Sequence, residues 1–394
     1  MRQEFLSFSP PDLTDKEVAE VLDTLTSDWI TTGPKTRRFE DAFSDFVGAP
    51  AAAAVNSCTA ATMVALAAMG IGEGDAVLTT TLTFVSTVHV IEHVGATPIL
   101  VDISPETLNI DPAQLDLAVE RARARGLRPR AIIPVHFGGL PCDMPAIVDV
   151  ARRHGLAIVE DAAHALPARI GDRYVGAILD DIDHAVAFSF YATKNLTTGE
   201  GGMLTGSPAL IDEARLWILH GMSRDAWQRY GRGGSHLYDV VRPGFKCNMT
   251  DIAAAIGLQQ LGRLEALHRQ RLALASIYDQ MLAELPVILP PCVDGTVHAR
   301  HLYPIRLKLD ALTISRDEVI AELAAANIGT SVHFIPVHML HYYRTRYSLC
   351  PEDFPVAQRA FESLISLPLN TRMGEADVVD VVRSLHEILH RFSA

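Results

Sequence analysis

Residues 156–164 read LAIVEDAAH, a short apolar run that ends in two carboxylates followed by small residues. Similar runs recur along the chain, at residues 52–55, 77–81, 97–102, 131–135, 185–190 and 202–205. Between them lie helical patterns over residues 58–69, 84–94, 112–125 and 143–154. Short apolar strands that alternate with amphipathic helices predict an α/β fold, in which a mostly parallel sheet is covered by helices on both faces.

Different patterns flank this region. Thr14 to Glu17 form a capping box, which predicts an N-terminal helix, and residues 36–47 predict a second one. A long helical pattern runs from about Met249 to Leu285, and the Pro- and Gly-rich stretch 286–299 is typical of a linker. The remaining patterns predict strands at 301–308 and near 330–335, and helices at 315–326, 355–363 and 374–391. We therefore expect a large domain over 1–250, a connecting helix over 251–285 and a small α+β domain over 286–394.

The composition excludes several classes of protein. Of the 394 residues, 48% are hydrophobic and 21% charged, so the chain can bury a core and is neither disordered nor fibrous. A net charge of −13 argues against a nucleic-acid partner. We find no run apolar enough to span a membrane, no signal-peptide pattern, and five scattered cysteines without metal-ligand spacing. These features predict a cytoplasmic protein with no membrane partner.

Three segments together suggest a cofactor. Residues 56–61, NSCTAA, open a helix after an apolar run, where free N–H groups suit a phosphate. Asp161 follows a strand, and Lys194 lies in the loop of AFSFYATKNLTTGEGG (187–202), in a chain where only five of the 34 basic residues are lysines. Separately these residues fit helix capping, a turn and a surface charge. Together they supply what pyridoxal 5′-phosphate (PLP) requires, which is a phosphate site, a carboxylate for the ring nitrogen and a Schiff-base lysine.

Three other patterns have simpler explanations. His89 to His93 spell HxxEH, which places two imidazoles on one helical face as in a zinc site, but an ordinary helix fits the surrounding pattern better. His333, His338 and His341 form a second histidine group that Pro336 interrupts. The glycines of residues 70–74 follow a helix and precede a strand, the reverse of a dinucleotide-binding order. We expect no metal site and no nicotinamide site.

Several longer motifs resemble one family. FSFYATKNLTTGEGGML, VEDAAHALPA, GPKTRRFEDAF, PGFKCNMTDIAAAIGLQQL and SVHFIPVH look like nucleotide-sugar aminotransferases of the DegT/StrS type, which are PLP enzymes of fold type I. The resemblance implies catalytic roles for Lys194 as the Schiff-base lysine and proton shuttle, Asp161 at the ring nitrogen, and His164 near the ring hydroxyl. It further implies cofactor contacts from Thr59, Ala60, Phe84 and Ser189, and from the partner subunit's Asn248, hence a homodimer with shared sites. The implied substrate contacts are Thr31, Thr32, Gly33, Pro34, Tyr191, Lys246, His333, Phe334, Ile335 and Pro336.

The same resemblance narrows the reaction. Relatives that remove oxygen from a sugar carry His where this chain has Lys194, and relatives acting on cyclitols carry glutamines where it has Ala192 and Thr193. GTSVHFIPVH (329–338) is similar to enzymes that aminate carbon 4 of a UDP-linked keto sugar, whereas Phe245 to Cys247 depart from the tyrosines frequent there. The expected activity is transfer of an amino group from glutamate to a keto sugar nucleotide, in cell-surface glycan or antibiotic sugar biosynthesis. The alternatives are a PLP aminotransferase acting on a non-nucleotide ketone, such as a cyclitol or an antibiotic precursor, and a non-catalytic regulatory homologue.

Overall fold

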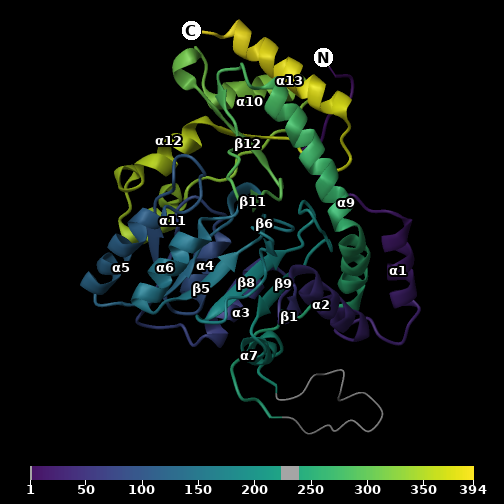
Figure 1. Cartoon of the computed structure of the whole chain (residues 1–394), viewed down its shortest axis with the longest axis vertical. Helices are drawn as coiled ribbons and strands as arrows, with labels where there is room; N and C mark the ends of the chain where they lie inside the picture. Colours follow the sequence, from purple (N-terminus) through teal and green to yellow (C-terminus); the bar gives the residue numbers. More distant parts are fainter. Residues whose placement is uncertain (1, 223–238) are drawn as a thin grey trace.

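A mixed sheet of seven strands forms the centre of the computed structural model, which describes residues 2–222 and 239–394 (Figure 1). Its strand order is β1-β9-β8-β5-β4-β2-β3, and every neighbouring pair is parallel except the two pairs that involve β9. The strands are β1 (Ala51–Val55), β2 (Asp75–Thr80), β3 (Thr97–Val101), β4 (Arg128–Ile133), β5 (Ala157–Asp161), β8 (His184–Ser189) and β9 (Gly202–Gly206). The mostly parallel α/β sheet predicted from the alternation is therefore confirmed.

Helices cover both faces of the sheet because successive strand residues point in opposite directions. In β1, for example, Ala53 and Val55 pack with α3 and α7, whereas Ala52 and Ala54 pack with Phe39 and Phe43 of α2. The helices around this sheet are α2 (Pro34–Val47), α3 (Cys58–Ala68), α4 (Ser86–His93), α5 (Leu115–Ala124), α6 (Met144–His154) and α7 (Pro208–Ile218). The carboxyl ends of β2, β4, β5 and β8 share one edge, which is where open parallel sheets bind ligands.

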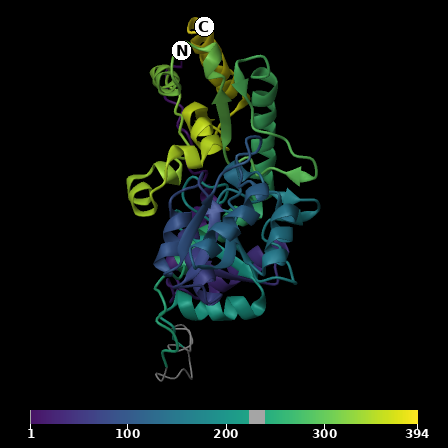
Figure 2. The same ribbon diagram turned by 90° about the vertical axis from the view of Figure 1, so that its left-hand side faces the viewer.

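A second, smaller core lies beyond the long helix α9 (Asp251–Met281) (Figure 1). A three-stranded sheet of order β10-β12-β13 is packed there against α9, α10 and α13. Figure 2 shows the two lobes one above the other, with both chain termini at the end of the smaller lobe. Its elements are β10 (Val287–Ile288), β12 (Tyr303–Leu307), β13 (Leu364–Leu367), α10 (Arg316–Ala325), α11 (His341–Tyr347), α12 (Pro355–Ser363) and α13 (Glu375–Arg391).

Smaller elements complete the described chain. A third sheet of order β11-β6-β7 joins the two lobes, and α1 (Asp15–Leu25) begins with the predicted capping box at Thr14. The three strands are β6 (Arg169–Ile170), β7 (Arg173–Tyr174) and β11 (Thr296–Val297), and short 3-10 helices lie at Pro112–Gln114, Phe137–Gly139, Leu309–Ala311, Val337–Met339 and Pro351–Asp353. None of the helices in the described residues has the length and apolar content needed to cross a bilayer.

The structure corrects two predicted elements. The predicted linker 286–299 contains β10 and β11, which pair with β12 and β6. The strand predicted near 330–335 does not form: Ser331 makes one bridge to Ser366, and the chain then turns towards the edge of the large sheet. Both errors involve very short pairings, which local sequence patterns resolve poorly. The part of the predicted 1–250 domain at residues 223–238 lies outside the described residues.

Candidate active site

A pocket of about 590 Å³ opens at the carboxyl edge of the large sheet. It contains nine of the residues predicted from the sequence, from five separate segments of the chain. These are Thr59, Phe84, Asp161, His164, Ser189, Tyr191, Lys194, His333 and Phe334. The pocket also contains residues that sequence analysis did not single out, notably Phe8, Cys58, Thr83, Thr87, Glu200, His301 and Ser331.

Asp161 forms part of the buried wall of this pocket. Its Oδ1 accepts a hydrogen bond from the Ala163 amide at 3.1 Å, and its Oδ2 accepts one from the Thr87 hydroxyl at 2.8 Å. The preceding Glu160 points to the opposite face of the sheet, where it accepts hydrogen bonds from His136 and His184, both at 2.6 Å. The alternation of β5 therefore separates the two carboxylates of LAIVEDAAH, and only Asp161 lines the pocket.

Glu160 is ionised despite its burial. Although burial raises its pKa, the hydrogen bonds from His136 and His184 lower the pKa of Glu160 to about 2. The two histidine hydrogen bonds satisfy this buried carboxylate on the face of β5 that is turned away from the pocket.

Lys194 lies across the same pocket, in the loop between β8 and β9. Hydrogen bonds from the Lys194 amide to the Tyr191 carbonyl and from the Thr198 amide to the Phe190 carbonyl, both at 2.9 Å, close this loop. Burial lowers the pKa of Lys194 to about 8, although the nearby Asp161 carboxylate favours the charged ammonium. A lysine with a lowered pKa provides the neutral amine that attack on a carbonyl requires.

The amino terminus of α3 forms the next wall. Ser57 caps this helix by accepting a hydrogen bond from the Ala60 amide at 3.1 Å, and Thr59 in the first turn lines the pocket. Strand β9 approaches the helix start very closely: a Cβ atom on Gly202 would lie 2.5 Å from the Ser57 carbonyl carbon. Only glycine fits there, so β9 packs directly against the start of α3, beside Ser189.

Three imidazoles, from His164, His301 and His333, line the remaining wall. The rings of His164 and His301 are 4.5 Å apart, and the Gly138 amide donates to His164 Nδ1 at 3.3 Å. Burial lowers the pKa of all three, for His333 to about 4, so they are neutral near pH 7. His301 follows a Pro- and Gly-rich stretch and carries no distinctive local pattern, so the sequence offers no signal for it.

The other predicted residues lie outside this pocket. Ile335 and Pro336 follow its His333–Phe334 wall, and Ala60 lies behind Thr59 in α3. The rest gather at the amino terminus of α9, where the Asn248 amide donates to the Thr32 hydroxyl at 2.6 Å and the Gly33 amide donates to Asp251 at 2.9 Å. This second group, the α9 cluster, consists of Thr31, Thr32, Gly33, Pro34, Lys246 and Asn248.

The HxxEH pattern has structural partners. His89 Nδ1 lies 2.5 Å from the Tyr343 hydroxyl, and Glu92 accepts hydrogen bonds from the hydroxyls of Tyr342 at 2.7 Å and Tyr347 at 2.6 Å. The HxxEH residues therefore join α4 to α11. Because α11 follows the His333–Phe334 wall in the chain, these contacts also tie that wall to the large sheet. Within the described residues no three His, Cys, Asp or Glu side chains are placed to hold a metal ion.

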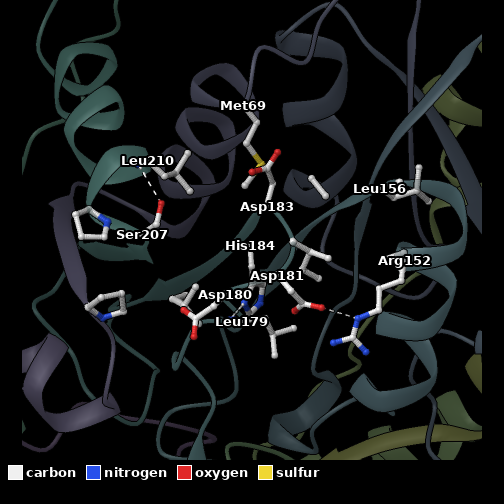
Figure 3. A pocket seen from close by; sticks show the side chains of 17 residues that line it. Met69, Arg152, Leu156, Leu179, Asp180, Asp181, Asp183, His184, Ser207 and Leu210 are labelled. Carbon is white, nitrogen blue, oxygen red and sulfur yellow. Dashed lines mark hydrogen bonds and ion pairs between the residues drawn. The ribbon is translucent and has the colours of Figure 1, made fainter.

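A larger hollow, of about 690 Å³, lies at the amino ends of β5 and β8 (Figure 3). Its labelled side chains include three aspartates and the Arg152–Asp181 ion pair at 2.8 Å, and Ser207 caps α7 at its rim. No lysine lines it, and His184 on its wall is engaged with Glu160. The hollow therefore lacks the paired nucleophile and carboxylate that the smaller pocket brings together.

A half-buried lysine, a carboxylate and a helix amino terminus at the carboxyl edge of an α/β sheet define a PLP-binding class of enzyme. Residues 11–386 match the model of the DegT/DnrJ/EryC1/StrS aminotransferase family, and the chain belongs to this family. It is 47% identical, over 98% of both chains, to the spore coat polysaccharide biosynthesis protein SpsC of Bacillus subtilis.

Solved structures agree. Spr1654 of Streptococcus pneumoniae in its PLP form is 34% identical, with a TM-score of 0.88 over 98% of this chain and 99% of that one. PseC of Helicobacter pylori, an aminotransferase of pseudoaminic acid biosynthesis, is 26% identical, with a TM-score of 0.88 over 99% and 100% of the two chains. The protein is thus a PLP-dependent aminotransferase of fold type I, and the predicted family, fold class, enzyme class and cofactor are confirmed.

Proposed function

We propose that this enzyme moves the amino group of glutamate to a keto sugar carried on a nucleotide, at carbon 4 of a UDP-linked sugar, for the synthesis of a surface polysaccharide. The convergence of Lys194 and Asp161 in one pocket is the observation that carries the chemistry. The sugar assignment is supported by the 47% identity to a spore coat polysaccharide biosynthesis protein. All five cysteines are free thiols, which suits the reducing cytoplasm where we place the reaction.

The residues of the pocket fit the cofactor. The α3 amino terminus with Thr59 and Ser189 would hold its phosphate, with Ala60 next to Thr59 in the same turn, and Asp161 would hold a proton on its ring nitrogen. Phe84 would lie against the ring and His164 near its hydroxyl. When bound, PLP supplies an electron sink for negative charge at the carbon that bears the amino group. In each half-reaction Lys194 Nζ would carry a proton between the substrate carbon that bears the nitrogen and the cofactor.

The mouth of the pocket would receive the sugar. Tyr191 is 47% exposed there, and His333 is held by a 2.8 Å hydrogen bond between its Nδ1 and the Ser366 hydroxyl. A neutral imidazole and a phenol donate and accept hydrogen bonds with sugar hydroxyls without adding charge. The chain continues through Phe334 to Ile335, which is 50% exposed, and then to Pro336, which is buried.

We further propose that two chains share each site. The α9 cluster lies outside the chain's own pocket, and Lys246 contacts Asn248 within it. Helix α1 lies next to this cluster and turns its apolar residues to solvent. Its buried residues are the polar Glu17 and Thr24, whereas Leu22 and Leu25 are 57% and 53% exposed. An apolar helix face turned to solvent is typical of an interface, and it leads directly into the predicted substrate residues that begin at Thr31. A second copy of the chain would cover this face and place its α9 cluster at the neighbouring pocket.

The substrate is tested with the pyridoxamine form of the enzyme. A panel of keto sugar nucleotides and free keto cyclitols is offered, and the return of the absorbance of the lysine-linked cofactor is followed. We expect fast recovery with a UDP-4-keto sugar and slow recovery with free cyclitols. Recovery with cyclitols alone would overturn the sugar nucleotide assignment.

The shared site is tested by mixing an inactive Lys194→Ala chain with an inactive Asn248→Ala chain. A mixed dimer has one site with both lesions and one with neither, so up to about half of its sites should regain activity, as twofold symmetry requires. Absence of recovery after verified subunit exchange would show that Asn248 serves the pocket of its own chain.

A further inference from the structure

The Asp161 carboxylate is held by a segment remote in sequence. One oxygen accepts the Ala163 amide from its own loop, which is a local contact of the strand end. The other oxygen accepts the hydroxyl of Thr87 in α4 at 2.8 Å. Nothing in the resemblance of the sequence to its family assigned a role to Thr87, yet it is the side chain that fixes the second oxygen of the carboxylate.

The direction of the hydrogen bonds around Thr87 follows from the chemistry of the groups. An ionised carboxylate only accepts hydrogen bonds, so the single hydroxyl proton of Thr87 points to Asp161. The hydroxyls of Thr83 and Thr87 are 2.8 Å apart, and Thr83 must therefore donate to Thr87. Thr83, Thr87 and Asp161 are 1%, 2% and 7% exposed, so this chain of hydrogen bonds is shielded from water. Aligned hydroxyls in such a setting polarise and strengthen one another.

The same two threonines bracket Phe84. The Thr87 amide donates to the Phe84 carbonyl at 3.1 Å, which closes a turn at the start of α4. The Phe84 side chain is 58% exposed, and its ring lies 5.8 Å from that of Phe334. The ring itself has little packing, so the hydrogen bond between Thr83 and Thr87 is among the contacts that set the position of the turn, together with the buried Leu82 and Val88 on either side of it.

We propose that Thr87 is a positioning residue that couples the two protein surfaces facing the cofactor ring. It holds one oxygen of the Asp161 carboxylate in a fixed direction, and through the hydrogen bond between Thr83 and Thr87 it ties the Phe84 turn to that carboxylate. The proposal rests on the proposed placement of the ring between Asp161 and Phe84. A carboxylate held in one direction keeps its place against the ring nitrogen, so Thr87 helps Asp161 to keep a proton there.

The test compares Thr87→Val, which removes the hydroxyl and keeps the shape, with Thr87→Ser, which keeps the hydroxyl. Thr79→Val is the matched control, since Thr79 is fully buried and donates to the Ile133 carbonyl at 2.8 Å, away from the pocket. Each variant is loaded with PLP labelled with ¹⁵N in the ring, and the ¹⁵N chemical shift is followed against pH. We expect Thr87→Val to lose the ring proton at a pH lower than wild type by about 1 unit, which corresponds to one lost charge-assisted hydrogen bond.

The other variants make the result decisive. Thr87→Ser and Thr79→Val should titrate like wild type, and Thr83→Val should shift in the same direction as Thr87→Val but less. If Thr87→Val fails to fold, the Thr83→Val shift alone decides the matter. An unchanged titration in the folded Thr87→Val and Thr83→Val proteins, or an equal shift in Thr79→Val, would overturn the proposal. A wrong placement of the ring can be distinguished from a wrong role for Thr87. If the ring did not lie beside Asp161, the ring nitrogen would titrate in Asp161→Asn at the same pH as in wild type.

Discussion

The two ends of the central strands differ in what they can do. The hollow at the amino ends is larger, about 690 Å³ against about 590 Å³, and its lining combines three aspartates and Arg152 with apolar side chains such as Met69 and Leu156 (Figure 3). The pocket at the carboxyl ends is smaller, but it brings a lysine of lowered pKa to the same space as a carboxylate that accepts hydrogen bonds from Thr87, Ala163 and the Cys58 thiol. The difference shows that volume and charge alone do not make a hollow an active site. An active site needs groups that are shielded from water and held in fixed directions, because water then does not weaken their interactions.

The largest effect should come from removing the lysine of the carboxyl-end pocket. We expect Lys194→Ala to abolish transamination, because the four other lysines lie outside this pocket. Loss of the yellow colour of the lysine-linked cofactor and absence of turnover in the half-reaction with glutamate are the measurements. Turnover at the wild-type rate would show that Lys194 is not the lysine that holds the cofactor.

Asp161→Asn should have the next largest effect. A neutral amide cannot stabilise a proton on the ring nitrogen, so we expect the half-reaction with glutamate to slow by about 10²-fold or more. Stopped-flow absorbance measures that rate, and circular dichroism checks that the fold is retained. An unchanged rate constant would remove Asp161 from the chemistry.

The reactivity of the Lys194 amine should depend on pH differently from that of an exposed lysine. Because its pKa is lowered to about 8, the neutral, reactive fraction rises as pH increases through that value. In the cofactor-free protein, we expect modification of Lys194 by an amine-specific reagent to speed up about tenfold between pH 7 and pH 9 and then level off. Peptide mass spectrometry gives the rate at this site. A rise that continues well beyond pH 9 would show that burial does not perturb the amine.

The smallest effect is expected at the amino-end hollow. Asp181→Asn breaks an ion pair with Arg152 whose two side chains are half exposed, and such exposed pairs contribute little to stability. We expect turnover within about twofold of wild type and a urea unfolding curve close to that of wild type. A loss of activity comparable to that of Asp161→Asn would mean that the hollow takes part in function.

The sequence predicted the large sheet well, because its strands are apolar runs between capped helices. That Asp161 and Lys194 lie in one pocket could be predicted for a related reason: Asp161 ends one strand, Lys194 follows another, and both strand ends lie at the same edge. His301 and Thr87 could not be predicted, since His301 comes from the small lobe and Thr87 from a helix. Only tertiary packing brings His301 to His164 and Thr87 to Asp161. The short pairings of β10 and β11 were missed because two residues carry no periodic signal.

The outward face of α1 shows another limit. The capping box correctly predicted a helix here, but it does not say against what Leu22 and Leu25 of this helix pack. The helix instead turns Glu17 inward, where it accepts a hydrogen bond from Gln260 at 2.7 Å and pairs with Arg263 at 3.1 Å. An amphipathic pattern identifies an apolar face, and only the structure shows whether the chain's own core covers it.

The central claim is that the chemistry of this enzyme is carried out at Lys194, in the smaller pocket. Reduction of the PLP-loaded protein with borohydride fixes the cofactor permanently to the lysine that holds it, and peptide mass spectrometry then locates the label. We expect one pyridoxyl group per chain, on the peptide that contains Lys194. A label on Lys16, Lys35, Lys246 or Lys308, with Lys194 unmodified, would contradict the account.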